Sequence, residues 1–315
     1  GVFPVLLVLK AVIVSTIFLT IYKTGRNFDA TSTLSAILSC SAILAGLSRY
    51  VVRPQLFSYL ALALLAYLLW GFTKNKTAGK FIWCLPFLII AWDFVHGAIF
   101  GLVFWTSLAA GETVKLLFRN RFKAWGIPYN DHNDKVKMVW FWLAITILAA
   151  LLKPINGYEL YKSLFDLIDS NYIVNMTGEF LPTSWEQVFI PFWILFAVTI
   201  LILLANWRNT DLSHIFVLAP FIYLGVRYNR CVAVFSIVAA PIIAHNIQLF
   251  WQNSIKTERI KLLSFWTTIV IITIIFGWTT HIKFPKRQEN EIDPTGLSIG
   301  TGINQGFLPM GIIRF

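Results

Sequence analysis

The chain has 315 residues, of which 57% are hydrophobic and only 13% are charged, and its mean hydropathy is +0.69. Soluble domains carry roughly 25% charged residues, so a soluble globular fold is excluded, and the apolar content excludes disorder. The net charge of +11 would indicate nucleic-acid binding in a soluble protein, but lysine and arginine in cytoplasmic loops explain it in a membrane protein. We therefore expect a membrane protein whose partner is the lipid bilayer, with no nucleic acid.

Ten apolar segments follow one another along the chain. A helix needs about 20 apolar residues to cross a bilayer core of roughly 30 Å, and backbone in lipid must satisfy its own hydrogen bonds, which favours helices. We predict an all-α, polytopic bundle of about ten transmembrane helices, at residues 2–22, 33–48, 56–72, 81–95, 97–118, 138–152, 188–206, 212–226, 231–250 and 262–280. Residues 1–280 then form a transmembrane domain, and residues 281–315 begin an extramembrane segment.

The lysines and arginines between these segments divide unevenly over the two sides. One set of alternating loops holds 15 of them, and the opposite set, up to residue 280, holds 6, namely Arg49, Arg53, Lys153, Lys162, Arg227 and Arg230. The positive-inside rule assigns the richer set to the cytoplasm. Gly1, the long loop 153–187 and the tail 281–315 are then expected on the outer face.

Four arginines lie in short loops of that expected outer face. Arg49 and Arg53 precede the third segment, with Pro54 at its start. Arg227 and Arg230 join the eighth and ninth segments. Because guanidinium groups bind phosphate through paired hydrogen bonds, we predict that these arginines hold an anionic group. The alternative is that they extend to lipid headgroups.

Asp93 and His96 lie between the fourth and fifth segments, on the same expected side. Residues three apart share a helix face, so the carboxylate would orient the imidazole and favour its charged form. Such a pair in a partly desolvated cleft can move a proton, which makes both residues catalytic candidates. The alternative is a structural Asp–His hydrogen bond at a helix turn. Gly97 and Gly101 would permit close backbone approach.

Glu179 is the third catalytic candidate. It stands in Gly178-Glu179-Phe180-Leu181-Pro182, where glycine and proline constrain the backbone. His245 and Asn246, near the inner end of the ninth segment, are expected to be buried and hydrogen-bonded. The three cysteines lie inside apolar segments without the spacing of a metal site or a disulfide framework. We therefore predict no cofactor and assign no metal-binding residues. A divalent metal is kept as an alternative.

The motifs, in chain order, are Arg53-Pro54-Gln55, Trp92-Asp93-Phe94-Val95-His96-Gly97, Lys153-Pro154-Ile155-Asn156-Gly157-Tyr158, Glu179 before Pro182, and Arg227-Tyr228-Asn229-Arg230. Over nearly the whole chain they resemble a bacterial family of polytopic proteins that is similar to the GT-C glycosyltransferases, the polyprenyl-phosphate-sugar-dependent mannosyl- and arabinosyltransferases. The chain departs from the family pattern at Asp93 and Lys153, where asparagine is commoner, and at Phe180, where tryptophan follows the glutamate.

The resemblance implies a GT-C-like protein of the bacterial inner (plasma) membrane. It would transfer a sugar, with inversion, from a polyprenyl-phosphate carrier to an envelope glycan, lipid or protein acceptor at the outer face. In such enzymes an acidic residue in the first outer loop is the general base, and basic residues hold the leaving phosphate. That loop would precede Gly1, so we expect the chain to be a fragment without the base. The alternatives are a transporter, which would need charges near the midplane, and a non-catalytic envelope-polysaccharide assembly protein with the same fold.

Overall fold

The computed structural model describes residues 2–118, 133–151, 180–207 and 209–254. Within these ranges the chain is helical, and no strand forms. The α-helices are α1 (Val2–Asn27), α2 (Ser32–Ala45), α3 (Gln55–Thr73), α4 (Leu85–Val95), α5 (Ile99–Leu117), α7 (Asn133–Leu151), α10 (Ile190–Ala205), α11 (Leu212–Arg227) and α12 (Val232–Ser254). The tenth predicted span, 262–280, and the segment 281–315 lie outside the described residues.

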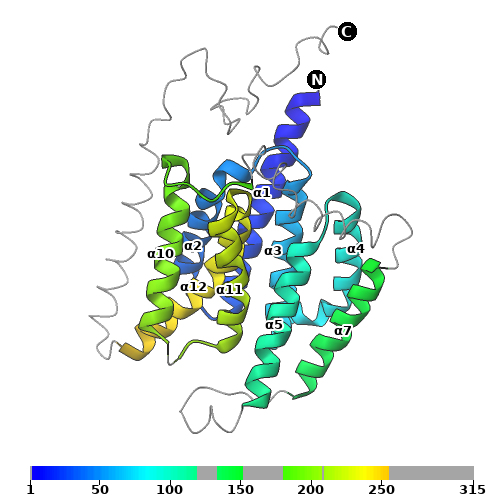
Figure 1. The fold of residues 1–315 in the computed structure, drawn as a ribbon, viewed down its shortest axis with the longest axis vertical. Coiled ribbons are helices and arrows are strands. Elements are labelled where there is room, and N and C mark those ends of the chain that lie inside the picture. The colour runs from blue at the N-terminus through cyan, green and yellow to red at the C-terminus, as the bar shows by residue number, and fades with distance from the viewer. Residues whose placement is uncertain (1, 119–132, 152–179, 208, 255–315) are drawn as a thin grey trace.

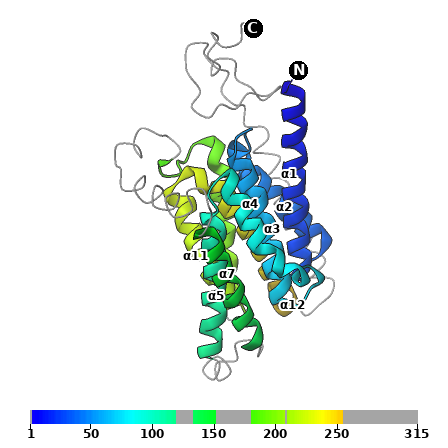
Figure 2. The same cartoon turned by 90° about the vertical axis from the view of Figure 1, so that its right-hand side faces the viewer.

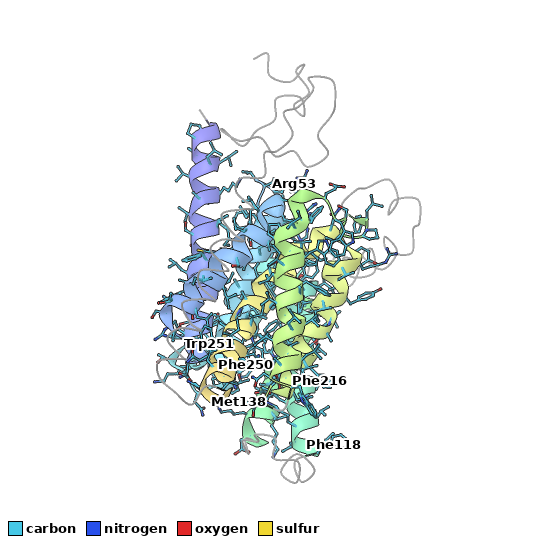
Figure 3. All side chains as sticks on the ribbon, turned by 90° about the vertical axis from the view of Figure 1, so that its left-hand side faces the viewer. Arg53, Phe118, Met138, Phe216, Phe250 and Trp251 are labelled. Carbon is cyan, nitrogen blue, oxygen red and sulfur yellow. The ribbon has the colours of Figure 1, made fainter. Side chains whose placement is uncertain are left out.

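Successive helices run in opposite directions, so their connections collect at two ends of one bundle (Figure 1). The connections after α2, α4 and α11 meet at one end, which we call the arginine end because it holds Arg49, Arg53, Arg227 and Arg230. The connections after α1, α3 and α10 meet at the other, which we call the lysine end. Figure 3 labels Arg53 at the first end and Phe118 and Met138 at the second.

Each of the nine apolar segments predicted before residue 255 contains a helix. Among the described residues, four helices are long and apolar enough to cross a membrane, namely Pro4–Asn27, Gln55–Thr73, Ile99–Leu117 and Asn229–Gln252. Three shorter apolar helices, α2, α10 and α11, accompany them. Large apolar side chains of α1, such as Val5, Val8 and Val12, face outward, as expected of a surface solvated by lipid rather than water. The fold is therefore that of an all-helical membrane protein.

Helix α12 forms the centre of the bundle. It packs against α2, α10 and α11 and also touches α1 and α3, and every residue from Cys231 to Ala244 is buried. A helix that is apolar all round belongs in a core, and its small residues let neighbours approach closely. Gly46 is one such contact, because a Cβ there would lie 2.9 Å from Cβ of Ala233. The central helix therefore holds the ends of its neighbours in fixed positions.

Helices α4, α5 and α7 form one side of the bundle, on the right of Figure 1 and facing the viewer in Figure 2. Gly101 of α5 lies against α4, since a Cβ at that position would lie 2.7 Å from Cζ3 of Trp92 and 2.9 Å from Cδ1 of Ile89. The close approach predicted for Gly101 is thus confirmed. The indole of Trp92 also reaches α3, where it donates a hydrogen bond to Ser58 of the candidate site.

Candidate functional site

Three connections at the arginine end carry Arg49, His96 and Arg230. Arg49 ends the 3₁₀ turn η1 (Leu47–Arg49), His96 follows α4, and Arg230 lies in the turn η5 (Asn229–Cys231). Arg49 and Arg230 both lie within electrostatic reach of the Cys231 side chain, and Arg230 lies within reach of His96. We call these three residues the arginine–histidine cluster.

A short hydrogen-bond chain orients His96. Nε1–H of Trp92 donates to Oγ of Ser58 at 2.9 Å, and the same Oγ lies 3.1 Å from Nδ1 of His96. Because the Ser58 oxygen accepts from the indole, its own proton is available for Nδ1. An imidazole that accepts at Nδ1 carries its proton on Nε2 when neutral. The chain therefore favours a neutral His96 with one N–H left to donate.

The surroundings of His96 favour the same neutral form. Burial and the positive charge of Arg230 lower the pKa of His96 below its usual range. From the sequence we expected Asp93 and His96 to share one helical turn, with the carboxylate favouring the charged form of the imidazole. Helix α4 ends at Val95, and the backbone of His96 is extended (φ −169°, ψ 126°). The imidazole is thus better suited to donating a hydrogen bond than to carrying a proton between groups.

Asp93 lies under the connection between α4 and α5. Its side chain is buried, with 5% of the residue exposed, and Oδ1 accepts a hydrogen bond from the backbone N–H of Ala98 at 2.7 Å. Ala98 directly precedes the first residue of α5. A carboxylate at a helix N-terminus satisfies an otherwise unpaired N–H and interacts favourably with the helix dipole. Asp93 therefore acts as a cap that positions the His96 turn.

This role predicts how two substitutions of Asp93 differ. Asp93→Ala removes the acceptor of a buried N–H and is expected to lower the free energy of unfolding by about 1–2 kcal/mol. Asp93→Asn retains an acceptor oxygen and should lose less than half of that. Thermal unfolding in detergent measures both, and Val95→Ala, at an exposed neighbour, is the control. An Asp93→Ala protein that melts like the wild type would contradict the capping role.

Aromatic side chains cover the two arginines of the cluster. Cζ of Arg230 lies 4.8 Å from the centre of the Phe180 ring, and Cζ of Arg49 lies 5.9 Å from that of Phe189. Guanidinium groups stack favourably on such rings. The stacking holds the cations in place without neutralising their charge.

Tyr50 adds a neutral donor beside Arg49. It is 2% exposed, and its hydroxyl has no hydrogen-bond partner among the described residues. Its ring packs edge-on against Tyr59 at 5.6 Å between centroids. Burial and the neighbouring Tyr59 raise the pKa of Tyr50, so the hydroxyl keeps its proton. Sequence reasoning missed this residue, because a single tyrosine beside an apolar segment carries no pattern.

Two further predicted arginines lie at the same end of the bundle. Arg53 is exposed just before α3, and Arg227 is exposed at the end of α11, with Cζ 5.4 Å from the Tyr228 ring centre. Glu179 lies outside the described residues, so its predicted role stays a prediction. Within the described part of the chain, no three His, Cys, Asp or Glu side chains gather in a way that could hold a metal ion.

A second polar cluster lies at the lysine end. Asp211 caps α11 by accepting from the N–H of Ser213 at 3.0 Å, and its carboxylate pairs with Lys115 at 2.8 Å and Lys74 at 3.3 Å. Lys115 also pairs with Glu112 at 2.7 Å. The cluster thereby joins α3, α5 and α11. Its one signal in the sequence is the capping pattern at Asp211, which says nothing about the lysines.

Two imidazoles lie next to this ion-pair cluster, His214 buried and His245 half-buried. His214 is fully buried, and its ring centroid lies 5.2 Å from those of Phe28, Trp70 and His245. Nδ1 of His245 lies 2.9 Å from the carbonyl oxygen of Phe28. Asn246 is buried and donates to the carbonyl of Ile242 at 2.8 Å, which confirms its predicted buried, hydrogen-bonded state. This cluster joins α1, α3, α11 and α12 and has the contacts of a structural core.

Comparison of the chain with models of protein families, with curated proteins and with solved structures finds no match.

Proposed function

We propose that the chain is the multi-pass, GT-C-like part of a glycosyltransferase of the bacterial inner (plasma) membrane, with about ten transmembrane helices. It would move a sugar from a polyprenyl-phosphate carrier to an envelope glycan, lipid or protein acceptor. The observation that carries the proposal is the arginine–histidine cluster, in which two guanidinium groups and a neutral imidazole gather at one end of a membrane bundle. The distribution of lysine and arginine supports this end as the outer face.

The cluster suits a departing phosphate. In the transfer, the bond between the anomeric carbon and the phosphate oxygen breaks, and its electron pair stays on the phosphate. The acceptor hydroxyl oxygen forms the new bond to carbon and loses its proton to a base. Guanidinium and N–H groups aimed at the phosphate stabilise the charge that develops there. Arg49 and Arg230 supply the charge, and His96 supplies a neutral N–H.

The surroundings of Asp93 bear on its proposed role. The buried Asp93 carboxylate is committed to the N–H of Ala98, which supports a positioning role rather than that of a base. Glu179 remains the proposed candidate beside the acceptor. The proposal therefore requires a base from outside the described residues.

Exposed aromatic residues support a location near the lipid headgroups. Trp185 is 76% exposed and stacks on Trp193, with 4.0 Å between ring centroids, and Phe94 is exposed beside the cluster. Tryptophan is enriched where the membrane meets water. A carrier lipid in the bilayer would present its phosphate at this depth, level with the arginines.

The protein, reconstituted in liposomes with radiolabelled polyprenyl-phosphate sugars, tests the proposal. Label is expected to leave the carrier for an envelope acceptor, with free polyprenyl phosphate as the second product. Uptake of a solute without transfer would contradict the proposal and favour a transporter. If the protein binds envelope polysaccharide but shows no transfer and no uptake, that result would also contradict the proposal and would favour an assembly protein.

A further inference from the structure

One face of α11 remains open along the bundle. Its exposed residues recur every fourth position, at Ile215, Ala219, Tyr223 and Arg227, and such a spacing forms one stripe on a helix. In Figure 1 this helix runs between α10 and α5. The stripe is apolar along most of its length and ends in a guanidinium at the arginine end.

A groove lies on the upper part of this stripe. It has a volume of about 440 Å³ and is lined by Pro182, Ala219, Ile222, Tyr223, Val226 and Arg227. Every lining residue except Pro182 comes from α11, and the lining contains one charged side chain, Arg227. The groove therefore combines an apolar floor with a single positive charge at one end.

The segment that carries Pro182 is held against the end of α11. Thr183 donates its N–H to the carbonyl of Val226 at 3.1 Å and its hydroxyl to that of Gly225 at 2.6 Å. The N–H of Asn229 in turn donates to the carbonyl of Leu181 at 2.9 Å. These bonds satisfy carbonyl groups that the end of a helix leaves without partners. Pro182 is thus a fixed wall of the groove.

We propose that this groove binds an anionic phospholipid of the bilayer, with the phosphodiester on Arg227 and an acyl chain along the apolar stripe. The charges match, since a phosphodiester carries one negative charge and the lining offers one guanidinium. Arginine binds phosphate oxygens through paired hydrogen bonds, and the Tyr228 ring under Arg227 supports its guanidinium.

The free polyprenyl phosphate that the proposed transfer releases is a poorer match for this groove than a phosphodiester. A phosphate monoester carries about −1.5 to −2 charges at neutral pH, which suits the two guanidiniums of the arginine–histidine cluster better than the one in the groove. The lipid site therefore does not depend on the proposed enzymatic function, and binding can be measured without any sugar transfer.

Native mass spectrometry of the full chain in detergent tests the site. Dioleoyl-phosphatidylglycerol, dioleoyl-phosphatidylcholine and farnesyl phosphate are the three probes. We expect phosphatidylglycerol to bind more tightly than the other two, and Arg227→Gln to weaken its binding about tenfold, the loss of one charge-assisted contact. Ala219→Phe, which fills the groove and leaves Arg227 intact, should weaken it by a similar factor.

Two control variants make the result specific to the groove. Lys23→Gln on α1 and Lys80→Gln between α3 and α4 each remove an exposed cation near the lysine end; both should leave phosphatidylglycerol binding unchanged. Equal binding of phosphatidylglycerol and phosphatidylcholine, or unchanged binding by Arg227→Gln, would overturn the proposal. Tighter, Arg227-dependent binding of farnesyl phosphate would also overturn it and assign the groove to the carrier.

Discussion

Arg230→Gln is expected to lower sugar transfer by at least about 100-fold in the full-length protein, while the protein still folds and inserts. Removing one preorganised donor from a developing oxyanion typically costs 10²–10³-fold in kcat. The positive charge of Arg230 acts on His96, and Cζ of Arg230 lies 4.8 Å from the centre of the Phe180 ring, which holds the guanidinium in place. Because the proposed function places this guanidinium on the departing phosphate, the loss should fall on kcat more than on KM.

Comparison variants separate this role from a general loss of charge. Arg230→Lys keeps the charge without the planar fork, so it should recover only part of the activity. Arg53→Gln removes an exposed arginine from the same end and is expected to cost less than tenfold. The thermal midpoint in detergent should stay the same in all three variants. If Arg53→Gln proved as inactive as Arg230→Gln, the cluster would not be the phosphate site.

Asp211→Ala is expected to lower the free energy of unfolding by about 3–5 kcal/mol, the largest effect on stability that the structure predicts. The side chain of Lys115 is only 17% exposed, so removing Asp211 leaves a largely desolvated ammonium group paired with Glu112 alone. The N-cap of α11 is lost as well. Denaturant titration of the detergent-solubilised protein, followed by tryptophan fluorescence, measures the change.

Two asparagine variants form a matched pair for this prediction. Asp211→Asn keeps a capping oxygen and loses the charge, so it should cost less than Asp211→Ala but still more than about 1 kcal/mol. Asp29→Asn removes a carboxylate that is 79% exposed and pairs with Lys76 at 2.8 Å. Exposed pairs contribute about 0–1 kcal/mol, so this variant should stay close to the wild type. Equal losses from both variants would contradict the assigned role of Asp211.

The same ion pairs make stability depend on pH. Burial alone would raise the pKa of Asp211, but Lys115, together with His214 and Lys74, holds it well below its usual range. A depressed carboxyl pKa stabilises the fold at pH values above about 4, the ordinary value for Asp. That contribution is lost as the pH falls from about 4 through the lower pKa of the folded state. Asp211→Asn should lack this part of the acid-induced loss of stability.

Hydropathy located the helices well and their boundaries less well. The segment predicted at 81–95 is a 3₁₀ turn, η2 (Thr77–Cys84), followed by α4 from Leu85. Pro86 in its first turn marks that start, since proline is favoured there. The segment predicted from residue 97 becomes helical only at Ile99, because Asp93 caps the intervening turn. Apolar runs indicate the approximate position of each helix in the sequence, whereas capping residues determine its first residue.

The sequence predicted which end of the bundle the arginines occupy, but not which residues they lie near. Alternating segments predicted that Arg49, Arg53, Arg227 and Arg230 share one end of the bundle, and the structure confirms that arrangement. Arg49 and Arg230, however, are brought near the same side chain, Cys231, while Arg227 lines the groove on α11. The sequence proposed Asp93 for proton transfer, and the structure places its carboxylate on the backbone N–H of Ala98, a contact that no sequence pattern indicated.

The sequence by itself determined that this is a helical membrane protein and which residues gather at each end. Hydropathy, proline positions and loop charge are local properties, so each can be read without knowing which helices touch. The tertiary structure alone decided that His96 bonds to Ser58 on another helix, and that Phe28 and His245, 217 positions apart, meet in one cluster. These contacts depend on how side chains of distant helices pack around α12, and no local pattern encodes that packing.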